Sequence, residues 1–315
     1  MAFDIPLPEA MAVNLVGKRK LWYAISLVAI VPGIISLALF GLRLGIDFTG
    51  GSLVEVEGRV DPAQVRTLAA ELDLSDVTIT SSGEGRSLIR YRDDGSPEER
   101  EASHQRFKDK LAESGVREVR FDTVGPSVSR DITRNAFISV VLASLAIVFY
   151  IAFAFRNAPP PVSPLSFGVA AIAALLHDAL LVIGIFSILG KLFGVEIDAL
   201  FVTAVLTTIG FSVHDTIVVF DRIRESLRRQ KGAFEEIVNA SILETLARSL
   251  NTSVTVLFVL LALYLFGGQS ISNFVLALLI GVAAGTYSSI FNASPLLVTW
   301  HNYKLKRLAA APVKK

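Results

Sequence analysis

Long apolar runs separated by short polar connections dominate the chain. Six of them stand out, at 22–42, 136–155, about 163–190, about 197–220, about 248–266 and about 271–298. Each is long enough to cross a bilayer as a helix, which takes about 20 residues. The fifth run is the weakest, because its uninterrupted apolar core begins only at Val254. The pattern predicts a polytopic α-helical membrane protein with six transmembrane helices.

The first run is predicted to be an uncleaved helix, TM1 at 21–42. It follows a polar N-terminal segment, 1–20, and it is longer than the apolar core of about 7–15 residues found in a signal peptide. No clear small-residue cleavage site comes after it. The run therefore stays in the mature protein as a membrane span.

Basic residues gather on one side of the predicted bundle. They precede the first run, follow the second, fourth and sixth, and include Lys18, Arg19, Lys20, Arg156, Arg222, Arg224, Arg228, Arg229, Lys231, Lys304, Lys306 and Arg307. The opposite side has Lys191 with Glu196, and no charge at 267–269. Because Lys and Arg favour cytoplasmic loops, both termini are predicted to be cytoplasmic, including the basic tail 304–315.

The long connection at 43–133 is predicted to form an extracytoplasmic domain. Strands are expected at 52–57, 77–80, 87–91 and 116–124, with a turn at 83–85. A helix capped by Asp61 is expected to run through Leu74, and a second helix begins at Ser96. The order βαββαβ is that of a ferredoxin-like α+β fold. The pattern leaves open whether this domain is a spacer or contacts a partner or substrate.

The remaining residues, 134–303, are predicted to form the TM2–TM6 bundle, with a cytoplasmic amphipathic segment at 221–247. Within it, Phe234, Ile237, Ile242 and Leu246 alternate with polar residues over 233–247. This spacing favours a helix that lies at the cytoplasmic membrane surface.

Composition agrees with a membrane protein and narrows its chemistry. Of the 315 residues 52% are hydrophobic and 19% charged, and the mean hydropathy is +0.55, whereas soluble domains have about 25% charged residues. The absence of Cys excludes disulfides and thiolate catalysis, and the four His have no zinc-type spacing. A net charge of +1 gives no sign of a nucleic-acid partner. No catalytic residue, metal or cofactor is expected, and the chain is predicted not to be an enzyme.

One ionisable pair, His214–Asp215, interrupts the fourth apolar run. A carboxylate at the centre of a membrane helix costs at least about 2.5–3.5 kcal/mol. Thr208, Ser212 and Asp215 have the spacing i, i+4, i+7, so they share one helix face. Such a stripe can pass protons or hold a cation. The alternative is a buried Asp that only binds a neighbouring helix, with Ser and Thr as interhelical contacts.

Arg248, at the start of the fifth run, is the predicted counter-charge. The fourth helix runs inward and the fifth outward, so Asp215 and Arg248 can lie at similar depth. A nearby Arg keeps a carboxylate ionised, and its withdrawal favours protonation, which describes a switch. The alternative is that Arg248 extends to the lipid headgroups.

Two further features of the runs are candidates for function or packing. His177–Asp178 in the third run repeats the His–Asp pair and is either a secondary relay or a packing contact. Gly281 and Gly285 form a G-x-x-x-G pattern, which is typical of close helix–helix contact in membranes.

Four motifs resemble those of the SecF family of protein-export membrane subunits, which belongs with SecD to the resistance–nodulation–division superfamily. They are GIDFTGG at 45–51, VGPSVS at 124–129, TIGFSVHDTIVVFDRIRE at 208–225 and RSLNTS at 248–253. The resemblance implies a heterocomplex with SecD, association with the SecYEG channel, and use of the proton-motive force to complete preprotein export. It also implies proton conduction through Asp215 and Arg248. His214 stands where relatives are expected to have Asn, and an imidazole there can join the relay or donate a hydrogen bond.

The sequence therefore predicts a proton-coupled subunit of the Sec export machinery in the cell membrane. Its expected partners are SecD, SecYEG, the translocating preprotein and the lipid bilayer. The main alternative is a scaffold that holds the export complex together without using the gradient. An independent small-solute carrier fits less well, because transporter sites lie between two repeats.

Overall fold

The chain forms two compact units in a computed structural model that describes residues 13–82, 85–93 and 95–309. Among these residues, the membrane unit comprises 13–42, 140–192 and 200–309, and the sheet unit comprises 43–139 with 193–199. The sheet unit thus takes in the connection at 193–199, which the sequence boundaries of 43–133 did not include. The membrane unit is helical, and the sheet unit combines a β-sheet with helices, as the pattern of apolar residues predicted.

The six predicted apolar helices are present in the described residues. They are α1 (Arg19–Phe40), α5 (Pro126–Ala154), α6 (Pro164–Phe193), α7 (Ala199–Arg229), α8 (Phe234–Phe266) and the helix from Ser272 to Arg307. The last consists of α9 (Ser272–Ser288), a π-helical turn (Ser289–Ala293) and α10 (Ser294–Ala309). By length and composition each can span a membrane, which confirms the predicted fold class.

Two helices begin earlier than the apolar runs suggested. α5 begins at Pro126 rather than at 136, because Arg130 and Arg134 lower the hydropathy without breaking a helix. α8 begins at Phe234 and includes 234–247 of the predicted amphipathic segment, whereas 221–229 belongs to α7. The structure differs here from a separate helix on the membrane surface, because Ile237, Val238 and Ile242 are buried inside the protein.

The N-terminal residues before α1 pack against the first turns of α8. Asn239 Oδ1 accepts hydrogen bonds from the backbone amides of Leu15 (2.9 Å) and Val16 (3.2 Å), and Arg19 pairs with Glu235 at 2.7 Å. These contacts hold the residues that lead into α1 against two polar residues of the amphipathic segment, Glu235 and Asn239.

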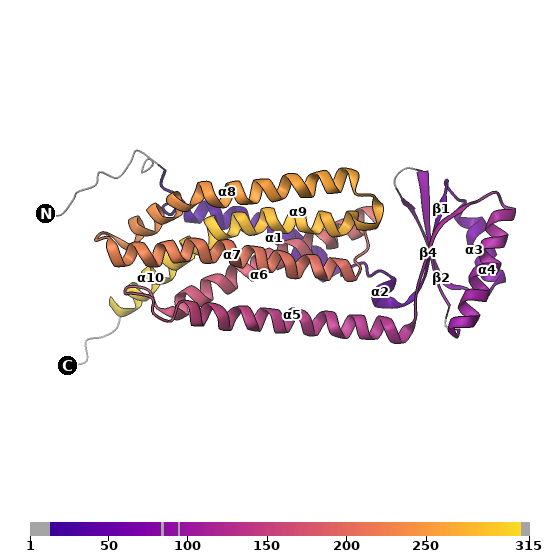
Figure 1. The fold of residues 1–315 in the computed structure, drawn as a ribbon, viewed down its shortest axis with the longest axis horizontal. Coiled ribbons are helices and arrows are strands. Elements are labelled where there is room, and N and C mark those ends of the chain that lie inside the picture. The colour runs from indigo at the N-terminus through magenta and orange to yellow at the C-terminus, as the bar shows by residue number, and fades with distance from the viewer. Residues whose placement is uncertain (1–12, 83–84, 94, 310–315) are drawn as a thin grey trace. The chain divides into compact units, whose positions relative to one another are not determined.

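The interior of the membrane unit is built mainly from α6, α7 and the α9–α10 helix, which lie side by side in Figure 1. Half of the most apolar window of α6 and of α7 is buried, against 6% for α5. α1 crosses α6 at two glycines: a Cβ on Gly33 would lie 2.8 Å from Gly184 Cα. Ser36 and Ser187 are hydrogen-bonded at 2.9 Å near the same crossing.

The sheet unit is a four-stranded antiparallel sheet with strand order β2-β3-β1-β4. Its strands are β1 (Gly51–Glu57), β2 (Ser75–Ser82), β3 (Arg86–Arg92) and β4 (Glu118–Val124). α3 (Pro62–Glu71) and α4 (Pro97–Glu113) cover one face of this sheet in Figure 1. Element order and strand order together confirm the predicted ferredoxin-like βαββαβ fold.

Local signals in the sequence set the ends of both helices. Asp61 accepts a hydrogen bond from Ala63 N, as predicted, and Ser96 with Glu99 forms a capping box. Part of the predicted turn at 83–85 lies outside the described residues. The core between sheet and helices consists of Val54, Val56, Val65, Ala69, Leu74, Ile89, Tyr91, Phe107 and Leu111.

The motif at 45–51 forms a short helix, α2 (Ile46–Thr49), followed by two glycines. Gly50 and Gly51 have φ of +73° and +116°, a region that other residues rarely adopt. A Cβ on Gly51 would also lie 2.8 Å from Tyr91 O on β3. The two glycines thus let the chain turn from α2 directly into the central strand.

Candidate functional site

Asp215 lies on the buried face of α7. Thr208, Ser212 and Asp215 are 3%, 1% and 7% exposed, in keeping with the single helix face predicted from their spacing. Ser249 of α8 donates a hydrogen bond of 2.6 Å from Oγ to Asp215 Oδ1. The other oxygen, Oδ2, is buried and has no hydrogen bond of ordinary length and angle in the described residues, although the Ser289 side chain lies close to the carboxyl group. Oδ2 is therefore the atom at which a proton or a further donor can bind.

Ser249, rather than Arg248, meets this carboxylate. The contact places the first half of α8 level with Asp215, as the opposite directions of the two helices predicted. Arg248 is exposed on the neighbouring helix position, and the described residues contain no ion pair between it and Asp215. Successive residues of an α-helix point about 100° apart, so a Ser249 that faces α7 turns Arg248 to the side.

His214 likewise lies beside the buried face and not on it. It is exposed, although it adjoins Asp215 in sequence. His214 and Arg248 thus occupy the same relation to the Asp215–Ser249 contact, each one residue away from a partner in it.

Asp178 is a second buried carboxylate, and it is fully bonded. It is 1% exposed. Its Oδ2 accepts hydrogen bonds from Ser212 Oγ and, at 2.7 Å, from Ser288 Oγ. Its Oδ1 lies 2.8 Å from His177 Nδ1. These bonds join α6, α7 and α9 at one point.

A π-helical turn continues this polar cluster toward Asp215. It begins at Ser289, whose Oγ lies 3.0 Å from Thr216 Oγ1. The single hydroxyl hydrogen of Ser289 can be donated to Gly285 O, at 2.7 Å, or to Ser212 O, at 3.2 Å. The wider turn brings two consecutive residues, Ser288 and Ser289, to the α7 side of the helix. Hydroxyls therefore extend from Asp178 to the residue that follows Asp215.

Gly281 and Gly285 lie where α9 packs against the same face of α7. A Cβ added to Gly281 would overlap the Thr208 side chain, and one on Gly285 would lie 2.8 Å from Ser212 Cβ. No larger residue fits at this contact without a shift of the helices. The close approach is what brings Ser288 within reach of Asp178.

Several hydroxyl residues of the cluster escaped sequence reasoning, namely Thr216, Ser249 and Ser289. A Ser or Thr within an apolar run carries little weight in hydropathy, and such residues are common between membrane helices. The signal that could have found them is their concentration: RSLNTS at 248–253 and TYSS at 286–289 interrupt otherwise apolar helices.

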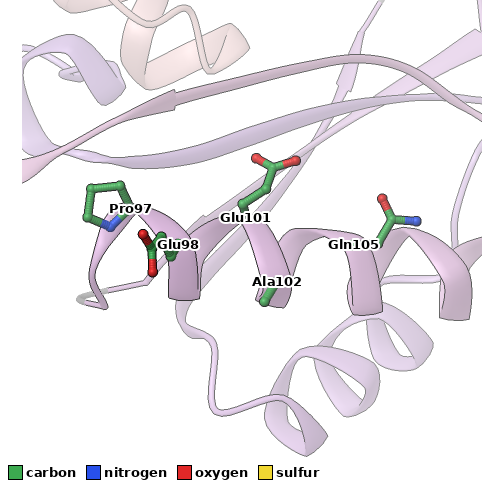
Figure 2. Close-up of a pocket in the computed structure, with 5 residues that line it drawn as sticks. All are labelled: Pro97, Glu98, Glu101, Ala102 and Gln105. Atoms are coloured by element: carbon green, nitrogen blue, oxygen red, sulfur yellow. The ribbon is translucent and has the colours of Figure 1, made fainter.

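Other parts of the described surface offer weaker candidates. No group of three or more His, Asp or Glu residues in the described ranges is arranged to hold a metal ion. An open pocket lies along α4 in the sheet unit, lined by Pro97, Glu98, Glu101, Ala102 and Gln105 (Figure 2). Its acidic side chains are exposed to solvent, so none of them is a buried polar group available to a ligand.

Comparison with known proteins identifies the fold and its family. Residues 106–303 match the profile of "Protein export membrane protein SecD/SecF, C-terminal", and residues 35–58 match that of the "SecD/SecF GG Motif". The protein translocase subunit SecF of Thermobaculum terrenum is 51% identical over 94% of this chain and 96% of its own. The chain belongs to the SecD/SecF family. The SecF subunit of Anaerolinea thermophila is 45% identical over 92% of this chain and 94% of its own.

Longer members of the family contain a part that is similar to this chain. SecDF of Bacillus subtilis is 36% identical over 93% of this chain, which spans 39% of that protein. The crystal structure of SecDF from Thermus thermophilus matches with a TM-score of 0.79 and 31% identity, covering 94% of this chain and 40% of that one. The chain therefore has a role in protein export as a multi-pass membrane protein, a transport role rather than catalysis.

Proposed function

We propose that this chain couples the proton-motive force to protein export, acting with SecD on preproteins that leave through SecYEG. The observation that carries the proposal is the bonding of Asp215: one oxygen is held by Ser249, and the other is buried without a partner among the described residues. A carboxylate that served only to join helices is expected to have both oxygens bonded, as Asp178 does.

The proposed cycle has two states of one carboxylate. With a proton on Oδ2, Asp215 is neutral and Ser249 is its partner, while Arg248 points away. When the proton leaves, the charge requires a cation, and Arg248 is the candidate because it precedes Ser249 by one residue. Rotation of α8 by about one residue exchanges the two partners. Thr208, Ser212 and His214 are the proposed path by which protons reach the site.

The gradient supplies enough energy for such an exchange. Moving one charge through 100 mV is worth about 2.3 kcal/mol.

A polar face on α7 and α8 supports an association with SecD. Along otherwise apolar helices, the exposed residues include Thr207, His214, Arg248, Asn251, Thr252 and Thr255. Polar side chains in a membrane face protein or water rather than lipid. SecDF relatives carry both parts in a single chain, so a SecD subunit is the partner we propose for this face.

The experiment that tests the proposal is Asp215→Asn in the full chain, reconstituted with SecD and SecYEG. We expect normal insertion and assembly but loss of the export that depends on the gradient, because an amide cannot release a proton. Arg248→Ala is expected to cause the same loss, since the ionised carboxylate then lacks its cation. Asp221→Asn is the matched control, because Asp221 is an exposed carboxylate on the same helix.

The scaffold alternative makes the opposite prediction. If Asp215 is only a buried packing group, a well-packed Leu replaces it without harm or with a gain in stability. Full gradient-dependent export by Asp215→Asn, or by Asp215→Leu, would refute proton coupling and favour the scaffold.

A further inference from the structure

Two segments far apart in sequence meet inside the sheet unit. One is 43–49, which links α1 to β1, and the other is 194–199, which links α6 to α7. Ile197 N donates to Arg43 O at 2.9 Å, and Gly45 N donates to Ile197 O at 2.8 Å, which makes a parallel bridge between Leu44 and Ile197. We call this pair of segments the joint.

The joint includes the first residue of α7. Asp47 Oδ2 accepts a hydrogen bond of 2.8 Å from Ala199 N, so it does for α7 what a capping residue does for a helix. Its negative charge also suits the positive end of the helix dipole. The cap therefore comes from a residue 152 positions away in the chain, and it ties the start of α7 to the connection before β1.

Charged side chains from the sheet and from both segments surround the joint. Glu196 Oε1 lies 3.3 Å from Arg43 Nε and 3.4 Å from Arg90 Nη1, and Arg90 Nη1 donates to Leu44 O at 2.8 Å. Arg90 belongs to β3, and its other nitrogen, Nη2, donates to Thr49 Oγ1. The sheet therefore binds both segments of the joint, although only 43–49 leads directly into a strand.

The backbone approach at the joint leaves no space. A Cβ on Gly45 would lie 2.9 Å from Ile197 O. The glycine of this motif is thus explained by the contact with the α6–α7 connection, just as Gly51 is explained by its contact with β3.

From this geometry we propose that Asp47 is a positioning residue that keeps Ala199, the first residue of α7, attached to the sheet unit during export. The proposal rests on the proposed function in one respect: α7 is the helix that carries Asp215, about 24 Å along its axis from Ala199. In the proposed function, a movement of α7 that begins at Asp215 reaches the joint through Ala199, the first residue of that helix.

Two substitutions of Asp47 test the role of the cap, because one keeps the hydrogen-bond acceptor and the other removes it. Asp47→Asn keeps an oxygen that can accept from Ala199 N, and Asn caps helices about as well as Asp. Asp47→Ala removes the acceptor. We expect Asp47→Asn to export normally and Asp47→Ala to lose about fivefold, the weight of one cap, while Asp215-dependent proton flux continues. Equal losses in flux and export, or no loss in either, would overturn the proposal.

A disulfide across the joint gives a test that needs no proton measurement. The chain has no Cys, so Leu44→Cys with Ile197→Cys introduces one defined pair. Bridge partners in neighbouring strands lie about 4.8 Å apart, within the range of about 4.4–6.8 Å that a disulfide spans between Cα atoms. Each single cysteine variant is the control for the oxidising treatment.

If the joint stays closed during export, oxidation of this pair leaves export unchanged, and it restores export to Asp47→Ala because the bond replaces the lost cap. Reduction should remove that rescue. Export that stops on oxidation and returns on reduction would overturn the proposal, since the joint would then have to open. Failure of the two cysteines to react would contradict the paired geometry itself. These outcomes are independent of Asp215→Asn, so the joint and proton coupling can fail separately.

Discussion

Asp178 and Asp215 are buried in the same bundle, but their bonding suits different roles. Asp178 receives two hydroxyls and lies beside His177, whereas Asp215 receives one hydroxyl, and its Oδ2 is buried without a hydrogen bond in the described part of the chain. This difference favours a packing role for Asp178 over a secondary relay. Both residues stand in apolar runs next to a His, so the sequence could find the two acids but could not rank them. Hydrogen-bond partners come from other helices, and no local pattern encodes them.

His104 is a buried titratable residue of the sheet unit that sequence reasoning passed over. It is 4% exposed, its ring stacks on Phe121 with centroids 3.4 Å apart, and its Nε2 lies 3.3 Å from Glu118. Burial lowers the pKa of His104 below its ordinary value of 6.5, and the attraction of Glu118 opposes this only in part. The folded domain therefore binds this proton less well than the unfolded chain does.

The stability of the sheet unit should accordingly fall in mildly acidic solution. Above pH 6.5 His104 is neutral in both states, and it makes no pH-dependent contribution. As the pH falls from 6.5 toward the folded pKa, only the unfolded chain gains the proton, so the free energy of unfolding decreases. Amide exchange of β3 and α4, corrected for intrinsic rates, measures this in the intact protein. His104→Gln should remove the slope, and an unchanged slope would assign it to other groups.

At the scale of elements, the sequence predicted that α9 makes a close helix contact, but it did not predict that α7 is the partner. The G-x-x-x-G spacing of Gly281 and Gly285 indicates a close helix contact, and the structure supplies Thr208 and Ser212 as the residues opposite. The π-helical turn after α9 was not foreseen, although Pro295, two residues after its end, lacks the amide hydrogen that an α-helix would use there. It depends on hydrogen bonds that Ser289 makes to α7 and to its own helix. Helix ends were misplaced for a related reason: hydropathy measures how apolar a segment is, whereas α8 extends through polar residues that packing holds in place.

Gly281→Ala should destabilise the bundle, since the added methyl overlaps Thr208 and either helix must move. Overpacking of this kind costs about 1–3 kcal/mol, which thermal unfolding in detergent can detect. Gly168→Ala in α6 is the matched control, because an added Cβ there meets nothing within 4 Å. The pair Gly281→Ala with Thr208→Gly should recover the loss, as contacting residues couple in a double-mutant cycle. Equal stability of the two alanine variants would mean that the helices do not approach so closely.

At the scale of the whole molecule, the fold could be predicted almost completely, because each level of the sequence indicated the same answer. Six apolar runs gave six helices, alternation gave four strands, and capping residues such as Asp61 and Ser96 set the helix starts. The joint was missed. It joins 43–49 to 194–199 through backbone hydrogen bonds and one Asp, and a contact between distant segments of irregular backbone leaves no periodic signal.

The orientation of the chain in the membrane follows from charge alone and makes the last prediction. Lys and Arg gather at the ends of the helices next to both termini, so the sheet unit is predicted to be extracytoplasmic. Single cysteines in this Cys-free chain report it: Glu113→Cys, exposed at the end of α4, and Lys231→Cys, exposed between α7 and α8. In right-side-out vesicles an impermeant maleimide should label Glu113→Cys at once and Lys231→Cys only after permeabilisation. The reverse pattern would place the sheet unit in the cytoplasm. There it could not act on a preprotein that emerges outside, so the role proposed for the joint in export would be refuted.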